Sequence, residues 1–161
     1  MQKKYWNYMV QIKHWFFYVD LYVEDSYKWD RHMNILSAIA SSTSIAAWAI
    51  WQELSFIWSL IIAMSQLLSA VKPFLPFNRR QKTLVPFMEE LKFLYNTMEY
   101  NWYKVSVGEL SEDEINELLL RFKNEFTSIE NKTLKEEILL ERNDFKLKAD
   151  IKTDLYFRDI F

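Results

Sequence analysis

The stretch from Met33 to Val71 constrains this chain most, because it carries one formal charge, Glu53, in thirty-nine residues. The whole chain has 161 residues and is 26% charged, so charge is strongly depleted here. Gln52 and Glu53 divide the stretch into two uncharged runs, 33–51 and 54–71. Each run is close to the roughly 20 apolar residues that a helix needs to cross a bilayer. The sequence therefore predicts a hairpin of two antiparallel transmembrane helices joined by a short polar turn.

The residues on either side of this hairpin predict its orientation. Lys28 and Arg31 precede it and Arg79 and Arg80 follow it, all with aromatic neighbours, whereas its tip carries no Lys or Arg. Loops rich in Lys and Arg stay on the cytoplasmic side, so we expect both termini in the cytoplasm and the hairpin in the plasma membrane. Two alternatives stay open: a soluble helical bundle that buries the hairpin, and a toxin that hides it until insertion.

The composition predicts an all-α fold. One Gly and three Pro leave few helix breakers in the chain. The absence of Cys excludes disulfides, thiolate catalysis and Cys-based zinc sites. A net charge of −2 gives no overall field that would attract nucleic acid. We expect three regions: a cytoplasmic aromatic-rich helix at 1–32, the transmembrane hairpin at 33–71 and a cytoplasmic helical region at 72–161.

The cytoplasmic regions show helical periodicity. In the first region, the residues at this spacing are Tyr8, Ile12, Trp15, Val19 and Tyr22. We expect most of these rings to pack against other helices or the membrane interface, and stacking on nucleobases is the alternative. Pro73 should end the hairpin, Pro76 and Pro86 should be further breaks, and a helix should begin near Thr83. The apolar face of that helix comprises Phe87, Leu91, Leu94, Met98 and Trp102.

Two further helices are predicted beyond Gly108. Ser111 and Glu114 have the spacing of a capping box. The apolar stripe that follows consists of Ile115, Leu118, Leu119, Phe122 and Phe126. The charged segment 134–161 is also predicted to be helical. We expect one of its faces to pack in the cytoplasmic bundle or between subunits; that face carries Leu140, Leu147, Ile151 and Leu155.

Polar residues inside the predicted spans raise the question of a pore. The first polar stripe consists of Asn34, Ser37, Ser41 and Ser44. Gln66 lies on a similar stripe of the second span. Small and hydroxylated residues let membrane helices approach closely, so we expect a homo-oligomer, with a tetramer favoured. The stripes then line a water-filled path or serve as packing seams. Glu53 either forms a ring of carboxylates that favours cations or is simply a polar turn residue.

No arrangement of residues in the sequence points to catalysis. His14 and His32 lie far apart in the chain, and neither has a neighbour at metal-ligand spacing. The sequence contains no nucleophile elbow, phosphate loop or zinc-protease motif. We therefore expect a protein that is not an enzyme and that uses no metal or cofactor.

Several features of the layout occur together. A leading helix precedes a hairpin that ends in Lys72-Pro73, and the helix Pro86-x-x-Met-Glu-Glu-Leu follows with Tyr95 and Tyr103. The segment Leu-Ser-Glu-Asp-Glu-Ile at 110–115 then opens a helical tail. This layout resembles the SLATT family, two-span membrane effectors of bacterial anti-phage conflict systems.

The resemblance implies a channel or pore in the bacterial inner membrane that arrests the growth of an infected cell. It also implies control by a cyclic nucleotide or an oligonucleotide from a partner nucleotidyltransferase. In the Hailong type of these systems, the partner makes DNA oligomers.

Basic residues near the expected cytoplasmic mouth are the candidates for contacting such a phosphate ligand. They are Arg31, Lys72, Arg79, Arg80 and Lys82. Alternatively, these side chains fix the topology and contact anionic lipid. A second function also stays open: a membrane-anchored scaffold whose cytoplasmic helices recruit a partner without conducting.

Overall fold

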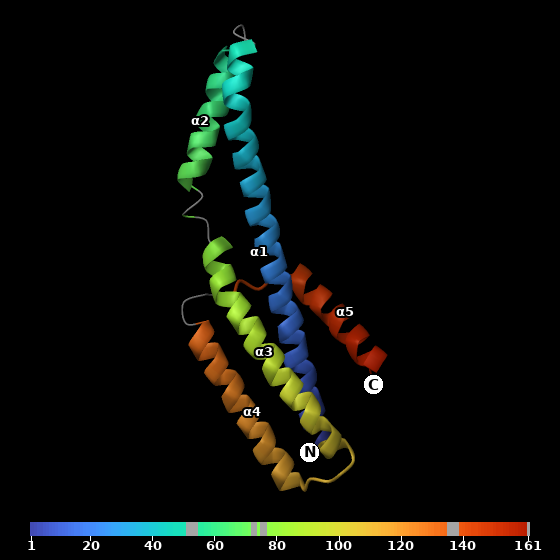
Figure 1. Cartoon of the computed structure of the whole chain (residues 1–161). Helices are drawn as coiled ribbons and strands as arrows, with labels where there is room; N and C mark the ends of the chain where they lie inside the picture. The colour runs from blue at the N-terminus through green and yellow to red at the C-terminus, as the bar shows by residue number, and fades with distance from the viewer. Residues whose placement is uncertain (51–54, 72–73, 75–76, 135–138, 161) are drawn as a thin grey trace. The chain divides into compact units, whose positions relative to one another are not determined.

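The computed structural model describes residues 1–50, 55–71, 74, 77–134 and 139–160 (Figure 1). Its helices are α1 (Gln2–Ile50), α2 (Ser55–Val71), α3 (Phe77–Ser106), α4 (Glu112–Thr133) and α5 (Asn143–Ile160). No strand occurs among the described residues, so the prediction of an all-α chain is confirmed.

The chain forms two compact units. Residues Met1–Glu24 and Arg80–Phe161 make up the first, which we call the bundle unit. Residues Asp25–Arg79 make up the second, which we call the hairpin unit. The long helix α1 contributes its beginning to the bundle unit and its remainder to the hairpin unit.

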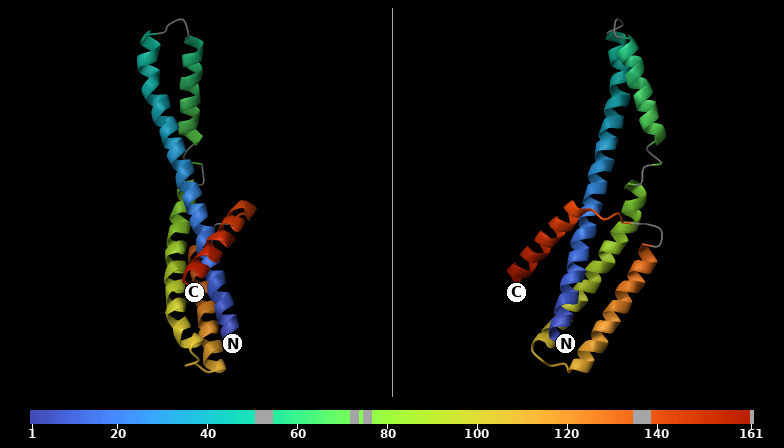
Figure 2. Two further views of the ribbon diagram at one scale, coloured as in Figure 1. Left: turned by 90° about the vertical axis from the view of Figure 1, so that its right-hand side faces the viewer. Right: turned by 180° about the vertical axis from the view of Figure 1, so that it is seen from behind.

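The bundle unit is organised around an antiparallel pair of helices, the start of α1 and α3. Figure 2 shows α4 on one side of this pair and α5 on the other. The phenol of Tyr5 on α1 is completely buried and donates a hydrogen bond to the carbonyl oxygen of Met98 on α3, over 2.8 Å. The ring of Tyr5 also lies edge-on to Phe122 of α4. A single buried side chain thus joins three helices.

The predicted apolar faces of α1 and α3 are confirmed. On α1, Ile12, Val19 and Tyr22 are buried, while Tyr8 and Trp15 are half-buried against the core. The buried residues of the α3 face are Phe87, Leu91, Leu94 and Met98, and Trp102 is partly buried beside them. Packing therefore accounts for most rings of the aromatic-rich N-terminal segment.

The predicted start of α3 and the predicted break at Pro86 are wrong. The helix begins at Phe77, before Thr83, and runs through Pro86. Pro86 lacks the N–H that would bond to the carbonyl of Lys82. It lies on the exposed face of α3, where water can solvate that carbonyl, while its neighbours Leu84 and Phe87 are fully buried. Core packing on either side of the proline therefore outweighs the local break.

The connection between α3 and α4 follows local sequence rules. Gly108 has a φ of 76°, and its N–H donates to the carbonyl of Val105, while the N–H of Glu109 donates to that of Lys104. These bonds form a Schellman motif, which requires a left-handed residue and so favours glycine. Ser111 and Glu114 then form the predicted capping box, in which each side chain bonds to the other's backbone N–H.

The stripe that opens with the capping box packs as predicted, whereas the predicted packing face of segment 134–161 is not buried in the bundle unit. On α4, Ile115, Leu119 and Phe122 are buried. On α5 the buried residues are instead Phe145, Ala149 and Thr153. The expected face is exposed in the bundle unit; its members are Leu140, which precedes α5, and Leu147, Ile151 and Leu155 on α5. Packing of this face inside the bundle is therefore wrong, and packing between subunits stays a prediction.

The hairpin unit contains α2 and the part of α1 that begins at Asp25. These two helices lie side by side and run in opposite directions (Figure 1). Residues 51–54, between the two helices, lie outside the described part of the chain. Among the residues that the structure does describe, no helix combines the length and apolar character that a membrane crossing requires.

Candidate functional site

The most unusual surface of the chain is the apolar exterior of the hairpin unit. The ring of Phe56 is 80% exposed and Met64 is 58% exposed. Other exposed apolar side chains of this unit are Ile35, Leu36, Ile57, Leu60, Ile62, Leu67 and Val71. Soluble monomers rarely expose continuous apolar patches larger than a few hundred Å². This surface therefore needs a cover, either lipid or protein.

The polar residues of the first predicted stripe bond within their own helix where they are described. The amide nitrogen of Asn34 donates to the carboxylate of Asp30 over 2.9 Å. The hydroxyl of Ser37 donates to the carbonyl of Met33 over 2.8 Å. The side chains of Ser41 and Ser44 lie outside the described part of the chain.

Gln66, the candidate of the second stripe, is exposed on α2. Its neighbour Ser65 is not part of that stripe, and its hydroxyl donates to the carbonyl of Ile62 over 2.8 Å. A serine that bonds to the carbonyl one turn earlier satisfies its donor without a partner helix, and its oxygen can still accept a hydrogen bond from water. Glu53, the candidate for the outer mouth, lies outside the described residues.

The five basic candidates are divided between the hairpin unit and the bundle unit. Arg31 is exposed on α1 and belongs to the hairpin unit. Arg80 and Lys82 lie in the first turns of α3 and belong to the bundle unit. Lys72 and the side chain of Arg79 lie outside the described part of the chain.

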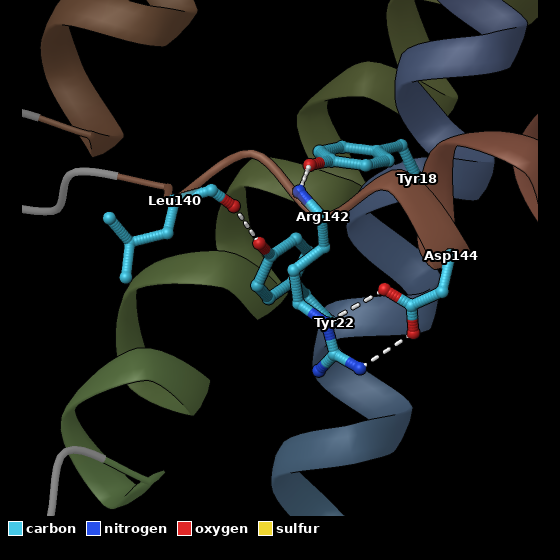
Figure 3. A network of polar contacts seen from close by, with 5 residues as sticks. All are labelled: Tyr18, Tyr22, Leu140, Arg142 and Asp144. Atoms are coloured by element: carbon cyan, nitrogen blue, oxygen red, sulfur yellow. Dashed lines mark hydrogen bonds and ion pairs between the residues drawn. The ribbon is translucent and has the colours of Figure 1, made fainter.

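A network around Tyr18 and Tyr22 was not predicted from the sequence (Figure 3). The Tyr22 hydroxyl donates to the carbonyl oxygen of Leu140, and the backbone N–H of Arg142 donates to the Tyr18 hydroxyl over 3.1 Å. The Arg142 guanidinium bonds to both carboxylate oxygens of Asp144, at 2.7 and 3.2 Å. The network fastens the segment before α5 to α1.

Burial, a hydrogen bond and two positive charges shift the pKa of Tyr22. Burial raises the pKa of Tyr22, and the hydrogen bond with Tyr18 raises it further. The positive charges of Arg142 and Arg80 act in the opposite direction and lower it. Arg80, a candidate from the sequence, and Arg142, which the sequence did not suggest, thus both lower the pKa of the Tyr22 phenol.

An aromatic cage around Lys13 was also missed. The ammonium nitrogen lies 3.7 Å from the ring centre of Tyr156 and 4.2 Å from that of Tyr95. It is also 5.3 Å from the ring centre of Phe17. These are distances of cation–π contacts. One carboxylate oxygen of Glu99 accepts hydrogen bonds from both tyrosine hydroxyls, at 3.0 and 3.2 Å.

The cage desolvates the amine that fills it. Burial lowers the pKa of Lys13, the Glu99 carboxylate partly opposes this shift, and Lys92 adds to the lowering. Because Lys13, Tyr95 and Tyr156 come from α1, α3 and α5, the cage links three helices. No local pattern in the sequence could have joined residues so far apart in the chain.

A cavity of about 330 Å³ lies between α1 and the segment that leads into α5. Its lining includes His14, Tyr18 and Glu141. The Nε2 atom of His14 lies 3.0 Å from a carboxylate oxygen of Asp150, but not in the alignment of a hydrogen bond. In the described part of the chain, no three His, Asp or Glu side chains are grouped so that they could hold a metal ion.

Comparisons with protein-family models, curated proteins and solved structures give no match to this chain. The functional argument therefore rests on the surfaces and contacts described above.

Proposed function

We propose that this chain is a membrane-inserted, homo-oligomeric effector whose hairpins assemble into a channel or pore. The observation that carries the proposal is the exposed apolar exterior of the hairpin unit. Lipid covers such a surface without any further protein, and a helix is suited to lipid because its backbone hydrogen bonds are internal. The proposed spans are 33–51 and 54–71, and both take in residues beyond the described part of the chain.

The polar contacts of the hairpin support this proposal. Ser37 and Ser65 donate to carbonyls of their own helices, so their hydroxyl protons need no partner in the hydrocarbon region. Several hairpins are needed to enclose a path, and we favour a tetramer. The proposed lining consists of Asn34, Ser37, Ser41, Ser44 and Gln66, with Glu53 at the outer mouth.

The proposed setting is anti-phage defence at the bacterial inner membrane, with both termini and the bundle unit in the cytoplasm. A nucleotide or DNA oligomer from a partner nucleotidyltransferase would control the pore. Its phosphates would contact the basic side chains near the cytoplasmic mouth. The candidates remain Arg31, Lys72, Arg79, Arg80 and Lys82. This step rests on the resemblance in layout.

The test is leakage of a small dye from sealed liposomes that contain the purified chain, together with its oligomer mass in detergent. We expect leakage from a defined oligomer. Ser37→Leu should reduce leakage while the oligomer mass is unchanged, since the bulkier apolar side chain would narrow and dry the path. The matched control is Ser128→Leu on an exposed position of α4, which should leak like the original chain. A monomer that needs no detergent would overturn the proposal.

A membrane-anchored scaffold is the second candidate function, because α5 exposes an apolar face that a protein partner could cover. It shares the membrane step with the channel but conducts nothing. Phage-infected cell extract is added to loaded liposomes to separate the two. Release of dye on addition supports the channel, and retention of dye by a stable oligomer supports the scaffold.

For the ligand step, Arg79→Gln/Arg80→Gln is compared with the original chain in the same liposomes. Loss of the response to extract, with basal oligomer mass retained, supports the basic cluster as the phosphate contact. An unchanged response excludes these two arginines.

A further inference from the structure

The outer face of α5 carries an apolar stripe that no described residue of the bundle unit covers. Leu147, Ile151 and Leu155 are 62%, 51% and 42% exposed. They lie four residues apart, so they form one row along the helix. The opposite face of α5 holds the buried residues Phe145, Ala149 and Thr153, which fix the direction in which the stripe points.

The sequence of α5 is self-complementary about Ile151. Leu147 and Leu155 lie four residues to either side of it. Asp144 and Arg158, which have opposite charges, lie seven residues to either side. With helical geometry of 100° per residue, these four positions and Ile151 all lie within about 40° of one line along the helix. Along this face, an acidic residue is followed by Leu, Ile and Leu and then by a basic residue.

We propose that this face packs against the same face of a second copy of this chain, with the two α5 helices antiparallel about a twofold axis at Ile151. In this arrangement Ile151 meets its own copy, Leu147 meets Leu155, and Asp144 meets Arg158. A twofold interface requires that if one position contacts another, the reverse contact also occurs. The two leucines are alike and the two end residues have opposite charges, so the face of α5 meets this requirement.

The charges select a second copy in this orientation. In a parallel pair, Asp144 would face Asp144 and Arg158 would face Arg158, which is unfavourable. In the antiparallel pair, both ends of the stripe carry opposite charges. The side chains of Asp144 and Arg158 are both accessible to a second copy. Asp144 bonds to Arg142 but stays partly exposed, and Arg158, which is 3.8 Å from Asp159, is exposed as well.

The rest of α5 is held in place, so the stripe is presented as a fixed surface. Lys152 pairs with Asp20 of α1 at 3.2 Å, and the ring of Tyr156 covers the ammonium of Lys13. One helix pair buries less than a standard interface of about 1,200 Å² or more. We therefore expect a weak contact, which crosslinking detects better than chromatography. The proposal does not rest on the membrane proposal, because it concerns the bundle unit alone.

The test uses the absence of Cys from the chain. Ile151→Cys is the only thiol of its variant, so a disulfide under mild oxidation joins two copies at the proposed axis. Disulfides need Cα atoms within about 7 Å of each other. In the antiparallel pair, two copies of Leu147→Cys would be about 12 Å apart along the helix, as would two copies of Leu155→Cys.

We expect Ile151→Cys to crosslink to itself and the Leu147→Cys and Leu155→Cys variants to crosslink with each other when mixed, but not alone. The matched control is Leu120→Cys on α4, an exposed leucine that should give only collisional dimer. Self-crosslinking of Leu147→Cys as strongly as Ile151→Cys would indicate a parallel pair and overturn the proposal. The proposal would also be overturned if Ile151→Cys gave no more crosslinked dimer than the Leu120→Cys control.

A charge variant tests the ends of the interface. Arg158→Glu places like charges opposite one another at both ends, and we expect it to reduce the crosslinking of Ile151→Cys by about fivefold at low salt. The expected loss should shrink at high salt, because screening weakens exposed charge pairs. An Arg158→Glu background that crosslinks as before contradicts the proposed register. Circular dichroism of the same sample shows whether the variant is folded.

Discussion

The membrane proposal makes a quantitative prediction for Met64 and Leu120. Met64 lies near the middle of α2 and Leu120 on α4, and each side chain is 58% exposed. If both faces contact water, replacing either residue by Lys is a surface change worth less than about 0.5 kcal/mol. If α2 lies in lipid, a Lys near its centre costs about 3 kcal/mol. If the proposal is right, Met64→Lys should have a ratio of membrane-inserted to free protein about 100-fold lower than that of Leu120→Lys; otherwise the two ratios should be similar.

The assay is the fraction of the full chain that stays with bacterial membranes after an alkaline wash. We expect Met64→Lys to reduce this fraction and Leu120→Lys to leave it unchanged. A hairpin whose insertion is very favourable would stay in the membrane despite one Lys. The double variant Met64→Lys/Leu67→Lys is therefore measured as well, and it should make the free energy of insertion less favourable by about 6 kcal/mol. If the double variant remains in the membrane fraction as fully as Leu120→Lys, α2 does not face lipid and the reasoning is refuted.

The other predictions concern the stability of the bundle unit, and each is measured by urea unfolding of the full chain. Gly108→Ala should lower the free energy of unfolding by about 1 kcal/mol, because Ala is disfavoured at positive φ; space is not the reason, since nothing lies within 4 Å of an added Cβ. Equal stability would contradict the left-handed turn. Ser111→Ala should cost about 1 kcal/mol through loss of the capping box, while Ser106→Ala, at the end of α3, is its control. Burial raises the pKa of Tyr5 above its usual value of 10.0, so the folded state keeps the phenol proton that the unfolded chain releases. Stability should therefore fall as the pH rises above about 10, and Tyr5→Phe should lose less between pH 9 and 11 than the original chain. An identical loss in both would show that Tyr5 is not the source.

Local sequence rules predicted those parts of the fold whose signals are local. The capping box at Ser111 and the stripe after it lie within a few turns of one helix, and both are present. On α5 the same reasoning left open whether the face of Leu147 packs in the bundle or between subunits, and the bundle buries the other face. This helix has apolar residues on two faces, and periodicity cannot tell whether Leu147 or Phe145 meets the core. The rings of Phe145 and Tyr156 decide, because they reach Tyr22 and Tyr95 on other helices.

Contacts between distant segments limited the prediction of sites. The cage around Lys13 combines residues from three helices, and the network around Tyr22 depends on a backbone carbonyl at Leu140. Neither leaves a pattern at fixed spacing. The basic candidates were predicted from their expected position at the cytoplasmic mouth of the hairpin, and two of them, Arg31 and Arg80, belong to different compact units. Spacing along the chain therefore predicted the packing faces of α1, α3 and α4, whereas the cage and the tyrosine network could not be predicted from it.

The cage around Lys13 also bears on how the bundle opens. The buried residues of α4 are Ile115, Leu119, Phe122 and Ile129, whereas α5 buries Phe145, Ala149 and Thr153. Attachment of α5 relies in addition on one caged ammonium and on the pair of Lys152 with Asp20, which salt weakens. In native-state hydrogen exchange, the amides of α5 should thus form a separate cooperative unit that opens at a lower free energy than α4. The helix α4 also has ion pairs to the rest of the bundle, Lys132 with Glu90 and the N-terminal ammonium with Glu112, so added salt should ease the detachment of both helices.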